Sequence, residues 1–232
     1  MGKKIVFITG ASRGIGAATV KKFVDNGWQV AGFYKENRIQ DTENSKYFQM
    51  DVESPESIKD ALAKAYAHFG QIDCLVNNVG GFGESGLANY TPEVMDFVYR
   101  VNERSTYLCT QGVLSWLKKG SIVNVSSSAG QVGSSDPVYG AAKAAVAGFT
   151  KSMAKALAPR VRVNCVAPGV VDTEMLRRYY DEDKMEKRRN EILLKEVAKP
   201  EYVADGIYFL ASDEARHITG ACLDINGGYV LR

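Results

Sequence analysis

Long hydrophobic runs are missing from this sequence. None of its 232 residues belongs to an uninterrupted apolar stretch of the roughly 18 or more that a membrane helix needs. The N-terminal stretch MGKKIVFITG has a lysine pair and then only a short apolar run before a glycine, which is too little for the core of a signal peptide. We therefore expect a cytoplasmic protein with no membrane partner.

Cysteine and histidine are also scarce. The 4 cysteines are far apart without a CxxC pair, and the 2 histidines are not clustered, so we expect neither a disulfide framework nor a metal site. His68 and His217 match no catalytic motif. Lysine plus arginine number 29 against 27 acidic residues, and no basic run is interleaved with aromatics, which argues against a nucleic-acid partner.

What the sequence does contain is a series of short apolar runs with helix-like stretches between them. Runs that are apolar almost throughout are typical of strands covered on both faces of a parallel sheet. The pattern predicts an α/β fold: one domain over 1–232, built on a doubly wound, Rossmann-type parallel sheet of about seven strands with helices on both faces. The expected strands are KIVFITG, WQVAGFY, KYFQMDV, IDCLVNNVG, GSIVNVSS, VRVNCVAPG and CLDINGG.

Helix-end signals support this pattern. Ser54, followed by Pro55 and later by Gly70, predicts a helix with a capped start and a glycine end. Two longer helices are expected at about 91–117 and 138–158.

The stretch 172–200 interrupts the pattern because it is densely charged and has only a thin apolar stripe. It is either a solvated helix pair or a flap over a pocket, since such loosely buried segments commonly serve as lids. We expect a substrate-binding flap.

A glycine-rich turn, TGASRGIG at 9–16, links the first expected strand to the first helix. Glycines there let the backbone approach a pyrophosphate, and the helix directs unpaired N–H groups and partial positive charge toward it. The turn in this position predicts a dinucleotide site.

The turn reads TGxxxGxG, and it is followed in order by NNVG at 77–80, Asn102, NVSSSAG at 124–130, YGAAK at 139–143, APG at 167–169 and ITGACLDINGG at 218–228. Together these blocks resemble the short-chain dehydrogenase/reductase family over nearly the whole chain. Its closing segment is most similar to that of the 3-oxoacyl-carrier-protein reductases.

The resemblance implies a set of cofactor contacts. Asp51 and Val52 would meet the adenine, Asn77 would border its ribose, and Val171 would contact the nicotinamide amide. Val79 replaces the family's usual alanine. The implied cofactor-binding residues are Gly10, Ser12, Arg13, Gly14, Ile15, Gly16, Tyr34, Lys35, Asp51, Val52, Asn77, Gly80, Tyr139, Lys143, Pro168, Gly169, Val171 and Thr173.

The end of the second expected strand bears on the choice of dinucleotide. An acid there would hold the ribose hydroxyls of NAD, whereas a basic group would accept a 2′-phosphate. The position falls at Tyr34 or Lys35, and the first acid is Glu36. Because Arg13 and Lys35 can neutralise a phosphate together, we expect NADP(H) in preference to NAD(H).

Tyr139 and Lys143 are four residues apart in a helix that is otherwise rich in small residues, so they share one face. A free phenol has a pKa of about 10 and is a slow acid or base at neutral pH. A neighbouring ammonium favours the phenolate, so we expect Lys143 to lower the pKa of Tyr139.

The resemblance gives these residues catalytic roles. Tyr139 would exchange a proton with the substrate oxygen, Ser127 would hydrogen-bond that oxygen, and Lys143 would hold the cofactor ribose. Asn102 would anchor a water that relays protons to Lys143. Ser126 is the alternative serine, because it restores the usual separation from Tyr139, whereas Gly130 three residues on favours Ser127.

The leading hypothesis is an NADP(H)-dependent reductase that converts a carbonyl, such as a 3-oxoacyl thioester, to a secondary alcohol. An NAD-dependent alcohol, sugar or steroid dehydrogenase is the alternative enzyme. A nucleotide-sensing protein without turnover is a third reading, although it has no need for serine, tyrosine and lysine together. We expect a homodimer or homotetramer formed by the two long helices.

Overall fold

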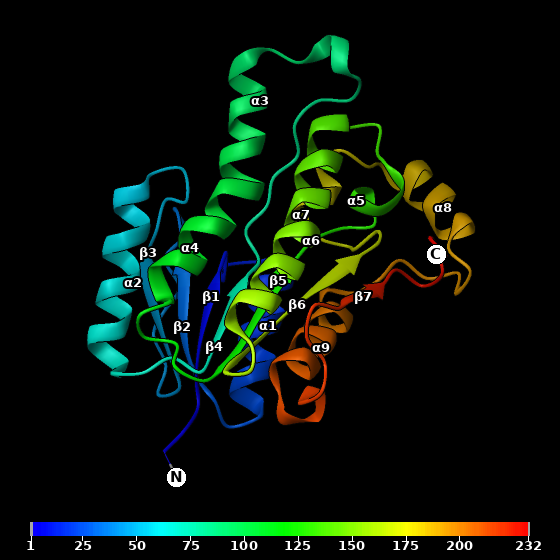
Figure 1. The fold of residues 1–232 in the computed structure, drawn as a ribbon. Helices are drawn as coiled ribbons and strands as arrows, with labels where there is room; N and C mark the ends of the chain where they lie inside the picture. Colours follow the sequence, from blue (N-terminus) through cyan, green and yellow to red (C-terminus); the bar gives the residue numbers. More distant parts are fainter. Residues whose placement is uncertain (1, 232) are drawn as a thin grey trace.

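The computed structural model describes residues 2–231 and contains a single seven-stranded sheet. All strand pairs are parallel, and the order across the sheet is β3-β2-β1-β4-β5-β6-β7 (Figure 1). The strands are β1 (Ile5–Thr9), β2 (Gln29–Tyr34), β3 (Ser45–Gln49), β4 (Cys74–Asn77), β5 (Gly120–Val125), β6 (Val161–Pro168) and β7 (Cys222–Ile225). The predicted doubly wound fold and its seven strands are confirmed.

Helices cover both faces of the sheet, as the apolar runs predicted (Figure 1). Side chains alternate along β1: Ile5 and Phe7 pack under α2, α4 and α6, while Val6 and Ile8 pack against α1 and α9. The helices beside the sheet are α1 (Gly14–Asp25), α2 (Pro55–Phe69), α3 (Pro92–Tyr99), α4 (Ser105–Val113), α6 (Pro137–Leu157) and α9 (Pro200–Ala211). None of the described helices is long and apolar enough to cross a membrane.

The ends of α2 follow the sequence signals. The Ser54 hydroxyl accepts a hydrogen bond from Ser57 N at 3.2 Å, and Pro55 occupies the first turn. Gly70 ends the helix with a left-handed φ of 72°.

The helix predicted at about 91–117 is divided by a π-helical turn, η2 (Arg100–Arg104). Within it Ser105 N donates to Arg100 O, five residues earlier. Side chains take up neighbouring carbonyls: Asn102 Nδ2 donates to Val98 O at 3.0 Å and Ser105 Oγ to Val101 O at 2.6 Å. The extra residue in this turn was not expected from the sequence.

Residues 172–200 contain the short helices α7 (Glu174–Arg177) and α8 (Glu182–Glu191). Their apolar side chains form a small cluster apart from the two main cores, made by Leu176, Met185, Ile192 and Val197. The remaining short elements are η1 (Leu87–Asn89), α5 (Ala129–Val132) and η3 (Asp213–Ala215).

Candidate active site

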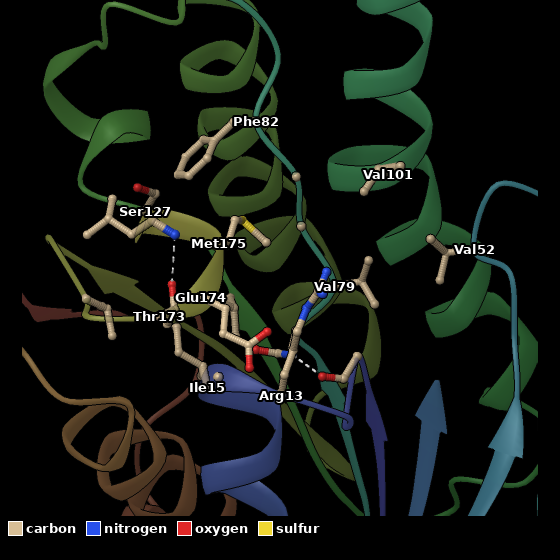
Figure 2. Close-up of a pocket in the computed structure, with 18 of the residues that line it drawn as sticks. Arg13, Ile15, Val52, Val79, Phe82, Val101, Ser127, Thr173, Glu174 and Met175 are labelled. Carbon is tan, nitrogen blue, oxygen red and sulfur yellow. Dashed lines mark hydrogen bonds between the residues drawn. The ribbon is translucent and has the colours of Figure 1, made fainter. Parts of the chain in front are cut away.

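A pocket of about 500 Å³ lies at the carboxyl ends of β1, β2, β4, β5 and β6. The strand order reverses between β1 and β4, and ligands of open parallel sheets bind at such a switch point. In Figure 2, Phe82, Ser127 and Met175 lie at one end of the pocket, and Val52 and Val101 lie at the other. Among residues 2–231, no group of three or more His, Cys, Asp or Glu side chains is placed to hold a metal ion.

Most of the predicted cofactor residues line this pocket. They are Gly10, Ser12, Arg13, Gly14, Ile15, Tyr34, Lys35, Asp51, Val52, Gly80, Tyr139, Lys143, Pro168, Gly169, Val171 and Thr173, and Ser127 joins them. Gly16, Asn77 and Asn102 do not line it.

The glycine turn leaves room for a phosphate group. Gly10 and Gly14 have φ of 65° and 53°, and a Cβ at Gly14 would lie 3.3 Å from the Thr173 side chain. A Cβ at Gly16 would lie 2.0 Å from Gly10 O, so Gly16 allows α1 to pack against the turn rather than facing the pocket. The start of α1, with Arg13 beside it and no side-chain cap, fits the pyrophosphate of a dinucleotide.

Asn77 and Asn78 take different roles. Asn77 is buried behind the pocket, where its Nδ2 donates to Thr110 Oγ1 at 3.1 Å and Asn124 Oδ1 at 2.9 Å. Asn78, which the sequence did not single out, lines the pocket and donates to Thr9 O and Gly10 O. It therefore holds the glycine turn against the end of β4.

Lys35 is already paired at the end of the pocket that contains Val52. Its Nζ lies 3.0 Å from Glu53 Oε1 and 3.2 Å from Asp51 Oδ2, and these contacts raise the pKa of Lys35, Glu53 contributing most. Glu53 also contacts Arg100. Arg13 is exposed and has no ion pair with the described residues, so it is the freer of the two predicted phosphate ligands.

At the other end, α6 presents Tyr139 and Lys143 on one face. Lys143 is buried with 3% of its surface exposed, and its Nζ lies 5.7 Å from the centre of the Tyr139 ring. The same Nζ donates to Val125 O, at the end of β5, at 3.0 Å. The spacing that suggested a shared face therefore brings the two groups together at the pocket.

The two candidate serines point in different directions. Ser126 Oγ donates to Lys143 O at 2.7 Å and so fastens the end of β5 to the backbone of α6. Ser127 is hydrogen-bonded to the Tyr139 phenol, and its Oγ accepts from Ala129 N at 3.1 Å. Only Ser127 places its hydroxyl beside the phenol.

The pKa values differ from the sequence expectation. Burial raises the pKa of Tyr139 to about 12, with a smaller contribution from the Asp136 charge, and the bond from Ser127 only partly opposes this. Burial also lowers the pKa of Lys143 to about 8. The expected lowering of the Tyr139 pKa by Lys143 is therefore wrong for this structure, because loss of water around the phenol dominates.

Asn102 is completely buried and grips the backbone of Gly81. Its Nδ2 donates to Gly81 O at 2.8 Å, and its Oδ1 accepts from Gly81 N at 3.1 Å. A Cβ at Gly80 would lie 3.0 Å from Asn102 Oδ1 and 3.1 Å from Lys143 Nζ, so both polar groups border the same small space.

Comparison with known proteins agrees with this fold and site. The family model described as enoyl-(acyl carrier protein) reductase matches residues 10–230. The chain belongs to the short-chain dehydrogenase/reductase family of oxidoreductases, which act on CH–OH and C=O groups.

Its similarity extends over whole chains. It is 39% identical to the 3-oxoacyl-[acyl-carrier-protein] reductase of Thermotoga maritima and 35% identical to that of Escherichia coli, covering 98% of this chain and of each relative. Among solved structures, a Thermoplasma acidophilum aldohexose dehydrogenase superposes with a TM-score of 0.94 at 31% identity, covering 99% of this chain and 95% of that one. A Brucella melitensis enzyme described as a glucose/ribitol dehydrogenase also superposes with a TM-score of 0.94, at 27% identity. The match covers 99% of this chain and 97% of that one.

Proposed function

We propose that the protein is an NADP(H)-dependent reductase that converts a ketone to a secondary alcohol, with a 3-oxoacyl thioester as the first candidate substrate. The observation that carries this proposal is the placement of Ser127 beside the Tyr139 phenol, with the buried Lys143 amine near the Tyr139 ring. These three groups meet at the end of the pocket opposite the adenine end.

A bound nicotinamide would supply the hydride, and the protein must supply the proton. Tyr139 is the proton donor to the substrate oxygen, and a pKa of about 12 keeps it protonated at neutral pH, which is the form that reduction requires. Ser127 hydrogen-bonds the same oxygen and stabilises the negative charge that develops on it. Lys143 would hold the cofactor ribose. Asn102 would anchor a water for Lys143, in line with the approach of both polar groups to Gly80.

The substrate class is supported by the relatives and by the pocket wall. The acyl-carrier-protein reductases named above act on 3-oxoacyl groups, and here Phe82, Met175 and Tyr179 give the pocket an apolar side for an acyl chain. Arg177, in the flap, pairs with Asp172 and Glu182, so it is not a free cation for an acidic partner.

One observation favours a second candidate, an NAD(H)-dependent sugar dehydrogenase. A 2′-phosphate at Lys35 would have to compete with Asp51 and Glu53, whereas the ribose hydroxyls of NAD(H) would not. The solved sugar dehydrogenases with a TM-score of 0.94 are consistent with this alternative.

A substrate and cofactor screen separates the two candidates. Acetoacetyl thioesters, simple ketones, aldehydes and aldohexoses are assayed with NADPH, NADH and their oxidised forms. The proposal predicts the highest kcat/KM for an acetoacetyl thioester with NADPH. In Arg13→Ala, the ratio of NADPH to NADH efficiency should fall about tenfold, because a charge-assisted bond to phosphate is lost. Equal or higher efficiency with NADH in the unchanged protein would contradict the cofactor assignment.

Tyr139→Phe tests the chemistry directly. It should lower kcat by about 10³-fold or more, since general acid catalysis contributes 10²–10⁴-fold, while leaving the dissociation constant of NADPH within about twofold. Retention of more than a tenth of the activity would show that the phenol is not the proton donor.

We also propose that the protein assembles through α4 and α6 into a homodimer or homotetramer. Exposed apolar side chains on the neighbouring surface include Tyr99 and Leu114, and α6 has a face of small residues suited to close helix packing. A monomeric mass in light scattering would contradict this assembly.

A further inference from the structure

We infer that Asp136 is a positioning residue that holds both Tyr139 and the backbone strap Gly80–Gly83 in their working places. The inference rests on the proposed role of Tyr139. Asp136 precedes α6 and is 92% buried, with 8% of its surface exposed.

The Asp136 carboxylate accepts hydrogen bonds from three separate places. Oδ1 accepts from Tyr139 N at 2.9 Å, which caps α6, and also from the Tyr90 phenol. Oδ2 accepts from Gly83 N at 2.7 Å. A carboxylate can accept at both oxygens, whereas an amide or hydroxyl at this position could not serve all three donors.

The strap Gly80–Gly83 is fixed at two points. Asn102 binds Gly81 through both its N–H and its carbonyl, and Asp136 binds Gly83. Between these points the Phe82 ring packs edge-on against Tyr139, with ring centres 4.8 Å apart. The two residues that tie the strap thus belong to the segments that carry the proposed catalytic groups.

Phe82 extends this link to the flap. Its ring also contacts Tyr179, after α7, with ring centres 5.6 Å apart. At Gly83 the strap passes close to Tyr90, because a Cβ there would lie 2.1 Å from the Tyr90 hydroxyl oxygen. Gly83 has no side chain of its own to hold the strap, so its position depends on the hydrogen bond to Asp136. Loss of the Asp136 tie therefore frees Phe82, and with it one wall around the Tyr139 phenol.

The decisive variant is Asp136→Asn, which is nearly isosteric and keeps a favourable helix cap but loses one acceptor and the charge. We expect kcat for the best substrate of the screen to fall about tenfold or more, because the phenol and its wall are misplaced. The dissociation constant of NADPH should remain within about twofold, since Asp136 does not line the pocket.

A pH profile separates positioning from mere loss of stability. The Asp136 charge contributes to the raised pKa of Tyr139, so in Asp136→Asn the midpoint of alcohol oxidation should move to lower pH. Tyr90→Phe keeps the charge and should lower kcat severalfold without moving the midpoint. The titratable groups facing the Tyr139 phenol and the Asp136 carboxylate are Lys143 and Tyr90, with Glu84 beside Tyr90 and Tyr179 across the Phe82 ring.

Ser54→Ala is the matched control, because it removes a helix cap far from the phenol and should lower thermal stability without changing kcat or the profile. Asp136→Asn with wild-type kcat and midpoint overturns the inference. If that variant does not fold, unchanged kcat in Tyr90→Phe overturns it instead. An active Tyr139→Phe would reject the proposed function, whereas an inactive Tyr139→Phe beside a fully active Asp136→Asn would reject only this inference.

Discussion

The amino edge of the sheet, where its strands begin, and the carboxyl edge, where they end, use charged side chains in opposite ways. At the amino edge, Arg162 of β6 donates to four carbonyls, three of them at the end of α9, and the Asp73 carboxylate accepts from Ile5 N. At the carboxyl edge, Lys143 is more deeply buried than Arg162, yet it donates to a single carbonyl of the described residues. Saturated polar groups brace the scaffold, whereas groups with spare hydrogen-bonding capacity are available to a ligand.

The largest expected effect concerns the amino edge. Arg162→Met should lower the free energy of unfolding by about 4 kcal/mol, because several partly buried carbonyls lose their donor. Urea unfolding measures the loss. At a temperature where the variant is folded, kcat/KM should stay within about twofold of wild type. Arg216→Met, at an exposed position, is the control, and a large activity loss in folded Arg162→Met would break the contrast between the edges.

At the carboxyl edge, we expect substitution of one serine to affect catalysis and substitution of the other to affect stability. Ser127→Ala should lower kcat about 100-fold, which corresponds to about 2.7 kcal/mol, with little change in melting temperature. Ser126→Ala loses its bond to Lys143 O and should chiefly cost stability, by about 1 kcal/mol. Steady-state kinetics and thermal melts of both variants decide, and a greater kcat loss in Ser126→Ala would reverse their assignment.

The burial of Lys143 predicts a pH-dependent stability. Its pKa of about 8 lies below the unfolded value of 10.5, so the unfolded chain binds more protons between these values and the cost of burying the ammonium is relieved as pH rises. Between pH 7.5 and 9.5, the free energy of unfolding of the wild type should rise by about 2 kcal/mol relative to that of Lys143→Met. The comparison with the variant cancels other buried groups, such as Cys74 and Cys109, whose pKa values burial raises to about 12. A constant difference across this range would contradict the assigned pKa.

The smallest effect compares two left-handed glycines. Gly70, at the amino edge, has φ of 72° and no atom near its would-be Cβ, so Gly70→Ala should cost about 1 kcal/mol of stability and leave NADPH binding unchanged. Gly14→Ala meets a similar backbone penalty but places its methyl group against Thr173 in the pocket. It should also weaken NADPH binding, about fivefold by fluorescence titration. Equal NADPH affinity in both variants would show that Gly14 serves only the backbone.

Much of the fold follows from short-range pattern. Strands buried on both faces need continuous apolar runs, so all seven could be placed, and the ends of α2 followed from Ser54 and Gly70. The glycine turn and the shared helix face of Tyr139 and Lys143 could be predicted for the same reason, because each depends on the backbone geometry of one short segment.

The remaining features depend on contacts between distant segments. Asn77 and Asn78 are neighbours, and only the phase of β4 decides which of them faces the pocket. The ion pairs of Lys35 join segments 16 to 18 residues apart, as the positions of Asp51 and Glu53 show. The raised pKa of Tyr139 reflects how much water the folded walls exclude, which no spacing along the chain encodes.

The π turn at 100–104 has a consequence for how this site can change. It holds one residue more per turn than the α-helix on either side, so the direction in which Asn102 points is set by chain length as well as by residue type. Point substitutions can alter the amide, but only a one-residue deletion would turn α3 relative to α4 and swing position 102 away from the strap. Single amino-acid substitutions therefore leave the direction in which residue 102 points unchanged. A deletion within 100–104 would remove its contact with the strap in one step.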